Sequence, residues 1–161
     1  MILTITTSVL YGQKKTIDLL KGNVGPYDCT YSKVINMDKG DTIFYLYMGF
    51  KNAKYKAITD LQSLFFKDQT ALDKFIADLK SALIEMDNKT SQVSWTGKEY
   101  SIDKYDFSQA LYISDEKGAY PTLTKKQVEK LIAWLERFKI GTDEIKPDTN
   151  SSDSKKQGSD D

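Results

Sequence analysis

The stretch IFYLYMGFKNAKYKAI, residues 43–58, alternates large apolar side chains and then becomes rich in lysine. Successive side chains of a β-strand face opposite sides of its sheet, so this pattern predicts a strand with two different faces. The predicted core face consists of Phe44, Leu46, Met48 and Phe50, and the opposite face consists of Ile43, Tyr45, Tyr47 and Gly49. Two tyrosines are therefore expected on the side of the strand that does not form the core.

A hairpin is predicted directly after this strand, with Lys51 and Asn52 as its turn. In that register Phe50 pairs with Ala53, Met48 with Tyr55, Leu46 with Ala57, Tyr47 with Lys56 and Gly49 with Lys54. Tyrosines and lysines then share the outer face. Gly49 leaves room for another backbone to approach closely, although a glycine within a strand is equally typical of a bulge.

Further strands and turns surround this hairpin. Apolar alternation predicts strands at residues 2–10, 16–20, 27–35, 56–66, 92–95, 98–102 and 110–114. Clusters of Gly, Asp and Pro, or a Thr-Gly pair, predict turns at residues 22–26, 37–41, 96–97 and 115–118.

Two amphipathic helices follow the two groups of strands. The first is predicted over roughly 69–86, with Asp68 as its N-cap, and the second over roughly 125–138. Thr124 followed by Gln127 is a capping-box pattern that predicts the start of the second helix. Strands followed by a helix, twice, predict an α+β class, in which two helices cover antiparallel sheets in two strand-rich/helix units.

Composition predicts one domain and an acidic tail. The chain has 161 residues, of which 40% are hydrophobic, and this is enough for one sizeable core. Residues 141–161 contain one aliphatic side chain, Ile145, together with six acidic residues and three lysines. Such a segment buries too little apolar surface to offset the entropy of ordering. We therefore expect a single domain at 1–140 and a disordered acidic tail at 141–161.

Charge and cysteine usage bear on partners and compartment. Lysine plus arginine and aspartate plus glutamate balance at 23 each, so the acidic tail leaves a mildly basic body. The single cysteine, Cys29, cannot form an intramolecular disulfide, which favours a reducing compartment and a small core residue. The N-terminal segment lacks the features of a signal peptide or membrane anchor. We expect a cytoplasmic protein without membrane association.

Several kinds of catalytic chemistry are not supported by the sequence. The chain has no histidine, which removes the commonest general base and metal ligand and every nucleophile–histidine pair. The glycines at 22 and 25 do not have the spacing of a phosphate-binding loop, and no nucleophile elbow occurs. The acidic pair Asp115 and Glu116 falls in a predicted turn, where a solvated role is typical. We expect a protein that is not an enzyme and has no metal or cofactor.

The tyrosine- and lysine-rich outer face suggests a platform for single-stranded nucleic acid. Bases stack on aromatic rings for about 1–3 kcal/mol each, and lysines neutralise phosphates. The candidate stacking residues are Tyr45, Tyr47, Tyr55 and Trp95, and the candidate phosphate contacts are Lys51, Lys54, Lys56 and Lys98. Tyrosine and lysine are also ordinary outward residues of an antiparallel strand, and Trp95 is equally suited to the core. Both interpretations stay open at this point.

The run Lys54-Tyr55-Lys56-Ala57-Ile58 resembles the Lys-Gly-Lys-Ala-Ala-Leu signature strand of Whirly-type single-stranded DNA-binding proteins. Their subunits are also two sheet-then-helix units, so the resemblance implies this fold and single-stranded DNA as the partner. The run departs from the signature at Tyr55, where the family has glycine, and at one alanine. An acidic tail behind a basic body is similar to phage and bacterial single-strand binders, although Ser159-Asp160-Asp161 lacks a terminal aromatic residue.

Two functions from different classes follow. The first is a sequence-independent single-stranded DNA-binding protein of phage type, homo-oligomeric, acting in replication or recombination in a bacterial cytoplasm. The second is a non-enzymatic protein-binding module, such as a phage inhibitor or adaptor of a host protein, which agrees better with the balanced charge. A replication or host protein is a further expected partner.

Overall fold

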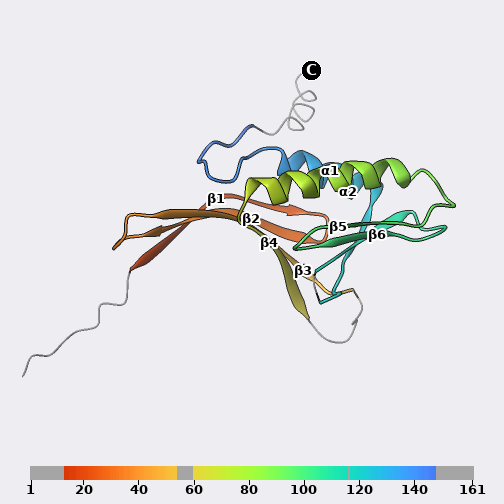
Figure 1. The fold of residues 1–161 in the computed structure, drawn as a ribbon, viewed down its shortest axis with the longest axis horizontal. Helices are drawn as coiled ribbons and strands as arrows, with labels where there is room; N and C mark the ends of the chain where they lie inside the picture. The colour runs from red at the N-terminus through yellow and green to blue at the C-terminus, as the bar shows by residue number, and fades with distance from the viewer. Residues whose placement is uncertain (1–12, 54–59, 116, 148–161) are drawn as a thin grey trace, which may run out of the picture.

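The computed structural model describes residues 13–53, 60–115 and 117–147. Four strands precede a helix, and four more strands precede a second helix (Figure 1). The first unit consists of β1 (Lys14–Val24), β2 (Tyr27–Asn36), β3 (Thr42–Lys51), β4 (Leu61–Phe66) and α1 (Gln69–Glu85). The second consists of β5 (Val93–Thr96), β6 (Ser101–Lys104), β7 (Ala110–Ser114), β8 (Thr122–Thr124) and α2 (Lys125–Leu135). The predicted α+β class is confirmed.

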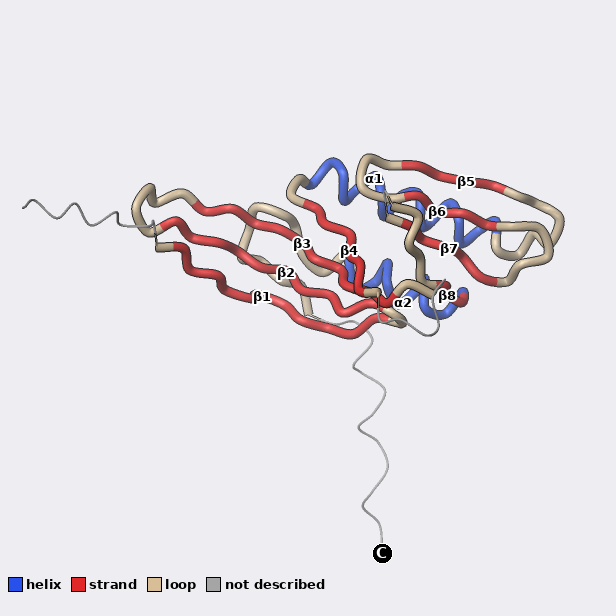
Figure 2. Tube along the Cα trace, turned by 90° about the horizontal axis from the view of Figure 1, so that it is seen from below, coloured by secondary structure: helices blue, strands red, loops and turns tan. Residues whose placement is uncertain are grey.

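The two sheets lie side by side, and both helices cover the same side of them. Each sheet is antiparallel with its strands in sequence order, β1-β2-β3-β4 and β5-β6-β7-β8. Figure 1 shows both helices on one side of the sheets, and Figure 2 shows the two sheets next to each other from below. α1 contacts β4, β5 and β6, whereas α2 contacts β1 and β8. Each helix therefore bridges the two sheets, and the buried apolar residues form one hydrophobic core.

β3 has the two faces that its sequence predicts. Leu46, Met48 and Phe50 are buried on the helix side, and Phe44 packs against the core. Tyr47 is exposed on the other side. The alternation of the strand thus orients its tyrosines away from the helices.

The predicted hairpin after β3 is wrong. β3 continues to Lys51, which pairs with Leu61, so the turn cannot lie at residues 51–52. The observed partners are Phe66 for Leu46, Leu64 for Met48 and Gln62 for Phe50. Phe66 and Leu64 are buried and extend the core across the sheet, which a lysine-rich partner segment would not do. Residues 54–59, with the candidates Lys54, Tyr55 and Lys56, lie outside the described residues.

Other strand boundaries also differ from the prediction. β1 extends to Val24, so the turn to β2 is limited to Gly25 and Pro26, with Gly25 at φ +59°. Gly25 is the first central residue of this two-residue turn, and glycine is favoured at such a position because it adopts positive φ without a steric cost. The short strand β8 was not predicted, since its core contact comes from Leu123 alone. The predicted strand at 2–10 lies outside the described residues.

Both helices begin at the predicted residues. The Asp68 carboxylate accepts the backbone N–H of Ala71 at 3.0 Å, as an N-cap does. The backbone N–H of Thr124 donates to the Gln127 side-chain oxygen at 2.8 Å, which is the reciprocal bond of a capping box. α2 ends at Leu135, before its predicted end.

Residues 141–147 were expected in the disordered tail, but they pack against the domain. The Tyr31 hydroxyl donates to the Thr142 carbonyl oxygen at 2.7 Å. Ile145 forms an antiparallel bridge with Phe138 and packs against the hydrophobic core. One aliphatic side chain and a few backbone hydrogen bonds thus hold this segment against the domain. The average composition of residues 141–161 did not indicate that its first residues would pack in this way. The rest of the predicted tail lies outside the described residues.

Candidate nucleic-acid interface

The candidate residues of β3 lie on the side of the sheets opposite the helices, which we call the open face. Tyr45 and Tyr47 face this side because they alternate with the buried residues of β3. Tyr47 pairs in register with Phe65 of β4, and the rings of Tyr45 and Phe65 are 5.0 Å apart between centroids. Tyr45, Tyr47 and Phe65 form what we call the aromatic cluster. Tyr47 is its most exposed described member, at 39%.

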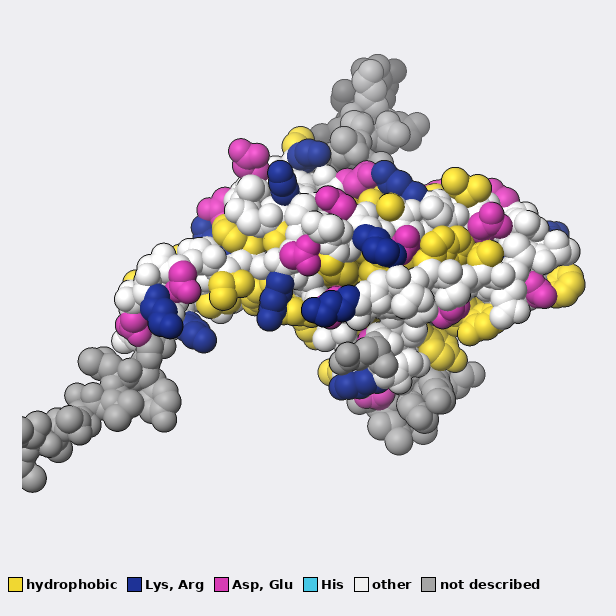
Figure 3. Space-filling model, in the orientation of Figure 1, with side chains coloured by type: hydrophobic (Ala, Val, Ile, Leu, Met, Phe, Trp, Pro, Cys, Tyr) yellow, Lys and Arg dark blue, Asp and Glu magenta, His cyan; other side chains and the backbone are white. Residues whose placement is uncertain are grey.

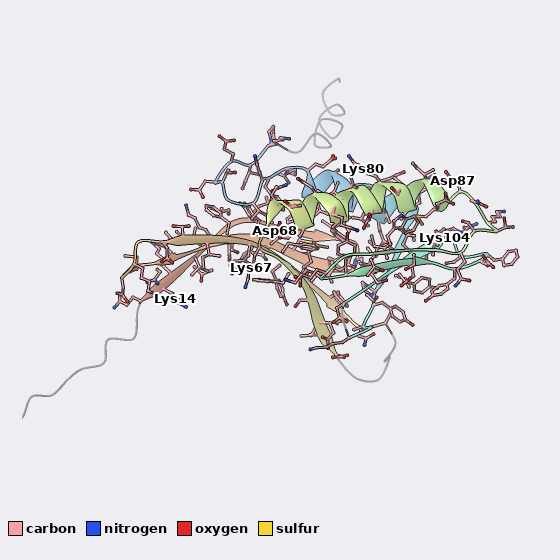
Figure 4. All side chains as sticks on the ribbon, in the orientation of Figure 1. Lys14, Lys67, Asp68, Lys80, Asp87 and Lys104 are labelled. Carbon is pink, nitrogen blue, oxygen red and sulfur yellow. The ribbon has the colours of Figure 1, made fainter. Side chains whose placement is uncertain are left out.

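Lysines lie on the same face as the aromatic cluster. The Lys67 ammonium is 5.0 Å from the centroid of the Phe65 ring, and Figure 4 shows Lys67 on the side of the sheet away from α1. Lys51 follows in alternation on β3 and is exposed. Lys21 of β1 is in the same row as Tyr47, because Thr30 of β2 pairs with both residues. Three cationic side chains therefore share the face with the rings.

A cavity of about 330 Å³ opens beside Tyr47. Its lining combines Pro26 and Asp28 from the first turn and β2, Tyr47, Gly49, Phe50 and Lys51 from β3, and Leu61 and Gln62 from β4. A Cβ added to Gly49 would lie 2.9 Å from the Tyr47 ring, so the ring lies along the strand over the glycine. Because Gly49 has no side chain, the Tyr47 ring can lie over it. The glycine is also part of the cavity lining.

Acidic side chains are interspersed among these lysines. The Asp18 carboxylate pairs with Lys21 at 2.7 Å and also accepts the Ser32 hydroxyl; these contacts hold its pKa below the usual value. Asp28 pairs in register with Gly49 and lines the cavity beside Tyr47 together with Lys51. Figure 3 views the molecule from the side, and there too cationic and anionic side chains are mixed.

Two predicted site residues do not join the aromatic cluster. Trp95 pairs with the buried Ile102, which places it on the helix side of the second sheet, where it packs against the core. This corrects its expected stacking role. Lys98 lies in the turn between β5 and β6, with its side chain 89% exposed and 3.8 Å from the Glu99 carboxylate. Trp95 therefore lies on the opposite side of the sheets from Tyr45 and Tyr47, and Lys98 lies in a turn of the second sheet, outside the strands that form the cluster.

Three residues of the open face were not among the site residues predicted from the sequence. Phe65 lies on β4, Lys67 directly follows that strand, and Lys21 lies on β1. The alternation of LQSLFF, residues 61–66, could have oriented Phe65 opposite to Leu64. Its proximity to Tyr47 depends on the pairing of β3 with β4, and the wrong hairpin register concealed that pairing.

No protein-family model matches the chain, and comparisons with curated proteins and with solved structures found no significant match. In the part of the chain that the structure describes, neither helix is long and apolar enough to cross a membrane. The same residues contain no group of three or more His, Cys, Asp or Glu side chains placed to hold a metal ion.

Proposed function

We propose that the protein is a non-enzymatic, sequence-independent single-stranded DNA-binding protein that uses the open face of its first sheet. The observation that carries the proposal is the aromatic cluster of Tyr45, Tyr47 and Phe65 with Lys67 beside it. Exposed rings offer stacking surfaces to bases of any sequence, and nearby lysines neutralise the phosphates between them. The cavity beside Tyr47 offers a place for one base next to the ring.

The order of the elements is further support. Four strands and a helix, repeated once, form the two sheet-then-helix units that a Whirly-type protein implies. Because both helices cover one side of the sheets, a broad sheet surface faces away from them (Figure 2). A helix-free sheet surface of this kind suits an extended single strand.

The alternative function is a protein-binding module, such as a phage inhibitor or adaptor of a host protein. Ile43 and Leu61 favour it, since these apolar side chains are 53% and 68% exposed. Their strands also carry the aromatic cluster. A protein partner would bury both, whereas a nucleic acid has less use for aliphatic side chains.

The test is a fluorescence-anisotropy titration of a labelled single strand of about 30 nucleotides, with duplex DNA as competitor. Tyr47→Ala is expected to weaken binding about tenfold, which corresponds to the loss of one stacked base. Its effect on thermal stability should be small because the ring is partly exposed and lies outside the core. Binding should also weaken steeply as salt rises.

Matched lysine variants test the position of the nucleic acid. Lys67→Ala, beside the aromatic cluster, is expected to weaken binding and to reduce the salt dependence. Lys80→Ala removes the same charge from α1, on the opposite side of the sheets (Figure 4), and should change little. Equal effects of the two variants would contradict the assigned face. Absence of salt-sensitive binding by the unmodified protein would favour the protein-binding alternative.

A further inference from the structure

The open face of the second sheet carries a separate row of tyrosines that the proposed DNA site does not use. The ring of Tyr112, on β7, is 5.1 Å from the ring of Tyr105 and 5.5 Å from the ring of Tyr120, in edge-to-face geometry in both cases. Tyr112 alternates with the buried Leu111 and Ile113, so it faces away from the helices. We call these three residues the tyrosine row.

An exposed phenylalanine follows the tyrosine row in an unusual backbone conformation. Phe107 is 79% exposed and has φ +59°, a region that side chains with a Cβ seldom adopt. Its backbone N–H donates to the Lys89 carbonyl oxygen at 2.8 Å, which fixes the conformation. A strained residue that presents a large apolar side chain to solvent is typical of a binding surface.

Two acidic side chains lie next to the tyrosine row. Asp103 pairs in register with Tyr112, and therefore lies on the same face of the sheet. Asp106 is exposed and lies between Tyr105 and Phe107 in the chain. The lysine of the same strand, Lys104, is buried on the opposite face, where it donates to the Ser91 carbonyl oxygen at 2.6 Å (Figure 4).

We propose that the tyrosine row, with Asp103 and Asp106, binds a cationic segment of a partner protein through its arginine or lysine side chains. A guanidinium or ammonium group is attracted to the face of a tyrosine ring, and the two carboxylates supply the opposite charge. The same carboxylates repel phosphate, so this face differs from the aromatic cluster with its lysines. The proposal does not depend on the DNA-binding function of the first sheet.

The test uses a fluorescein-labelled peptide of alternating glycine and arginine, and the same peptide with glutamine in place of each arginine. The full-length protein is expected to bind the arginine peptide and not the glutamine peptide in an anisotropy titration at low salt. Asp103→Asn and Tyr105→Ala should each raise the Kd about two- to fivefold, as the loss of one exposed cation–π or ionic contact does. Tyr47→Ala, on the first sheet, should leave the Kd unchanged.

Three results would overturn the proposal. The first is no binding of the arginine peptide by the unmodified protein. The second is binding that Tyr47→Ala weakens as much as Tyr105→Ala does. The third is a loss of single-stranded oligonucleotide binding in Tyr105→Ala, because that would make the tyrosine row a nucleic-acid surface. Thermal unfolding of each variant checks that it is folded, and failure of the oligonucleotide to bind any variant would affect only the proposed function of the first sheet.

Discussion

At the scale of single residues, two buried tyrosines on β2 have opposite hydrogen-bonding states. Tyr27 and Tyr31 are four positions apart, so they share the helix side of the strand, and both are buried. The Tyr31 hydroxyl has one proton, which the carbonyl oxygens of Lys139 and Thr142 share at 2.8 and 2.7 Å. The Tyr27 hydroxyl has no partner among the described residues. A buried polar group without a partner lowers stability, whereas a bonded one raises it.

We predict that Tyr27→Phe raises the free energy of unfolding by about 1 kcal/mol, because it removes a desolvated hydroxyl and keeps the ring. The ring contact with Phe50, 5.6 Å between centroids, is retained. Tyr31→Phe is the matched variant and should lower the free energy of unfolding by about 1 kcal/mol, since the hydrogen bond that this hydroxyl donates to the two carbonyl oxygens is lost. Urea unfolding measures both. A loss of stability in Tyr27→Phe would mean that its hydroxyl has a partner.

At the scale of elements, the contact between β1 and α2 depends on a glycine. A Cβ added to Gly22 would lie 2.7 Å from the indole nitrogen of Trp134, which is closer than such atoms approach. Trp134 is buried, and its ring packs edge-to-face against the ring of Phe138, so the indole has little freedom to move. The glycine therefore allows the helix to approach the strand.

We predict that Gly22→Ala lowers the free energy of unfolding by about 1–3 kcal/mol, as expected for an overpacked core. In a Trp134→Phe background the same substitution should cost less, because the smaller ring no longer occupies that space. Urea unfolding of the four proteins completes a double-mutant cycle. Strictly additive effects would argue against a clash between these two residues.

At the scale of the whole molecule, burial protects several acidic protons from ionisation. Burial raises the pKa of the Cys29 thiol from its usual 9.0 to about 12. Burial likewise raises the pKa of Tyr27, Tyr31 and Tyr100, and for Tyr100 the hydrogen bond to Asp78 at 2.7 Å adds to the effect. Between the ordinary and the raised values, the folded protein holds more protons than the unfolded chain does.

We predict that these groups leave the free energy of unfolding unchanged below about pH 8. The free energy of unfolding should then fall as the pH rises from about 9 towards 12. The sign follows because deprotonation is easier in the unfolded chain, so higher pH favours unfolding. Urea midpoints at pH 7, 9 and 10.5 measure the effect. Cys29→Ala removes one of the groups and should make the decline less steep, although its stability at pH 7 will also change. A flat profile up to pH 11 would show that these side chains ionise in the folded state.

Much of the architecture follows from local pattern. The two faces of β3 were predictable because Leu46 and Met48 alternate with Tyr45 and Tyr47, and a strand presents such residues to opposite sides. The helix starts were predictable because Asp68, and Thr124 with Gln127, form caps within one turn of chain. These interactions join neighbouring residues, so the sequence alone contains the required information.

Tertiary structure decided which residues meet. The pairing of β3 with β4 places Phe65 and Lys67 beside the tyrosines. Packing on the helix side keeps Trp95 away from the open face. The contacts of Ile145 hold residues 141–147 against the domain. Each result depends on which strand lies beside which and on the loop length between them. Such long-range choices are made by the burial of the whole core, to which distant segments contribute together, and no local pattern specifies them.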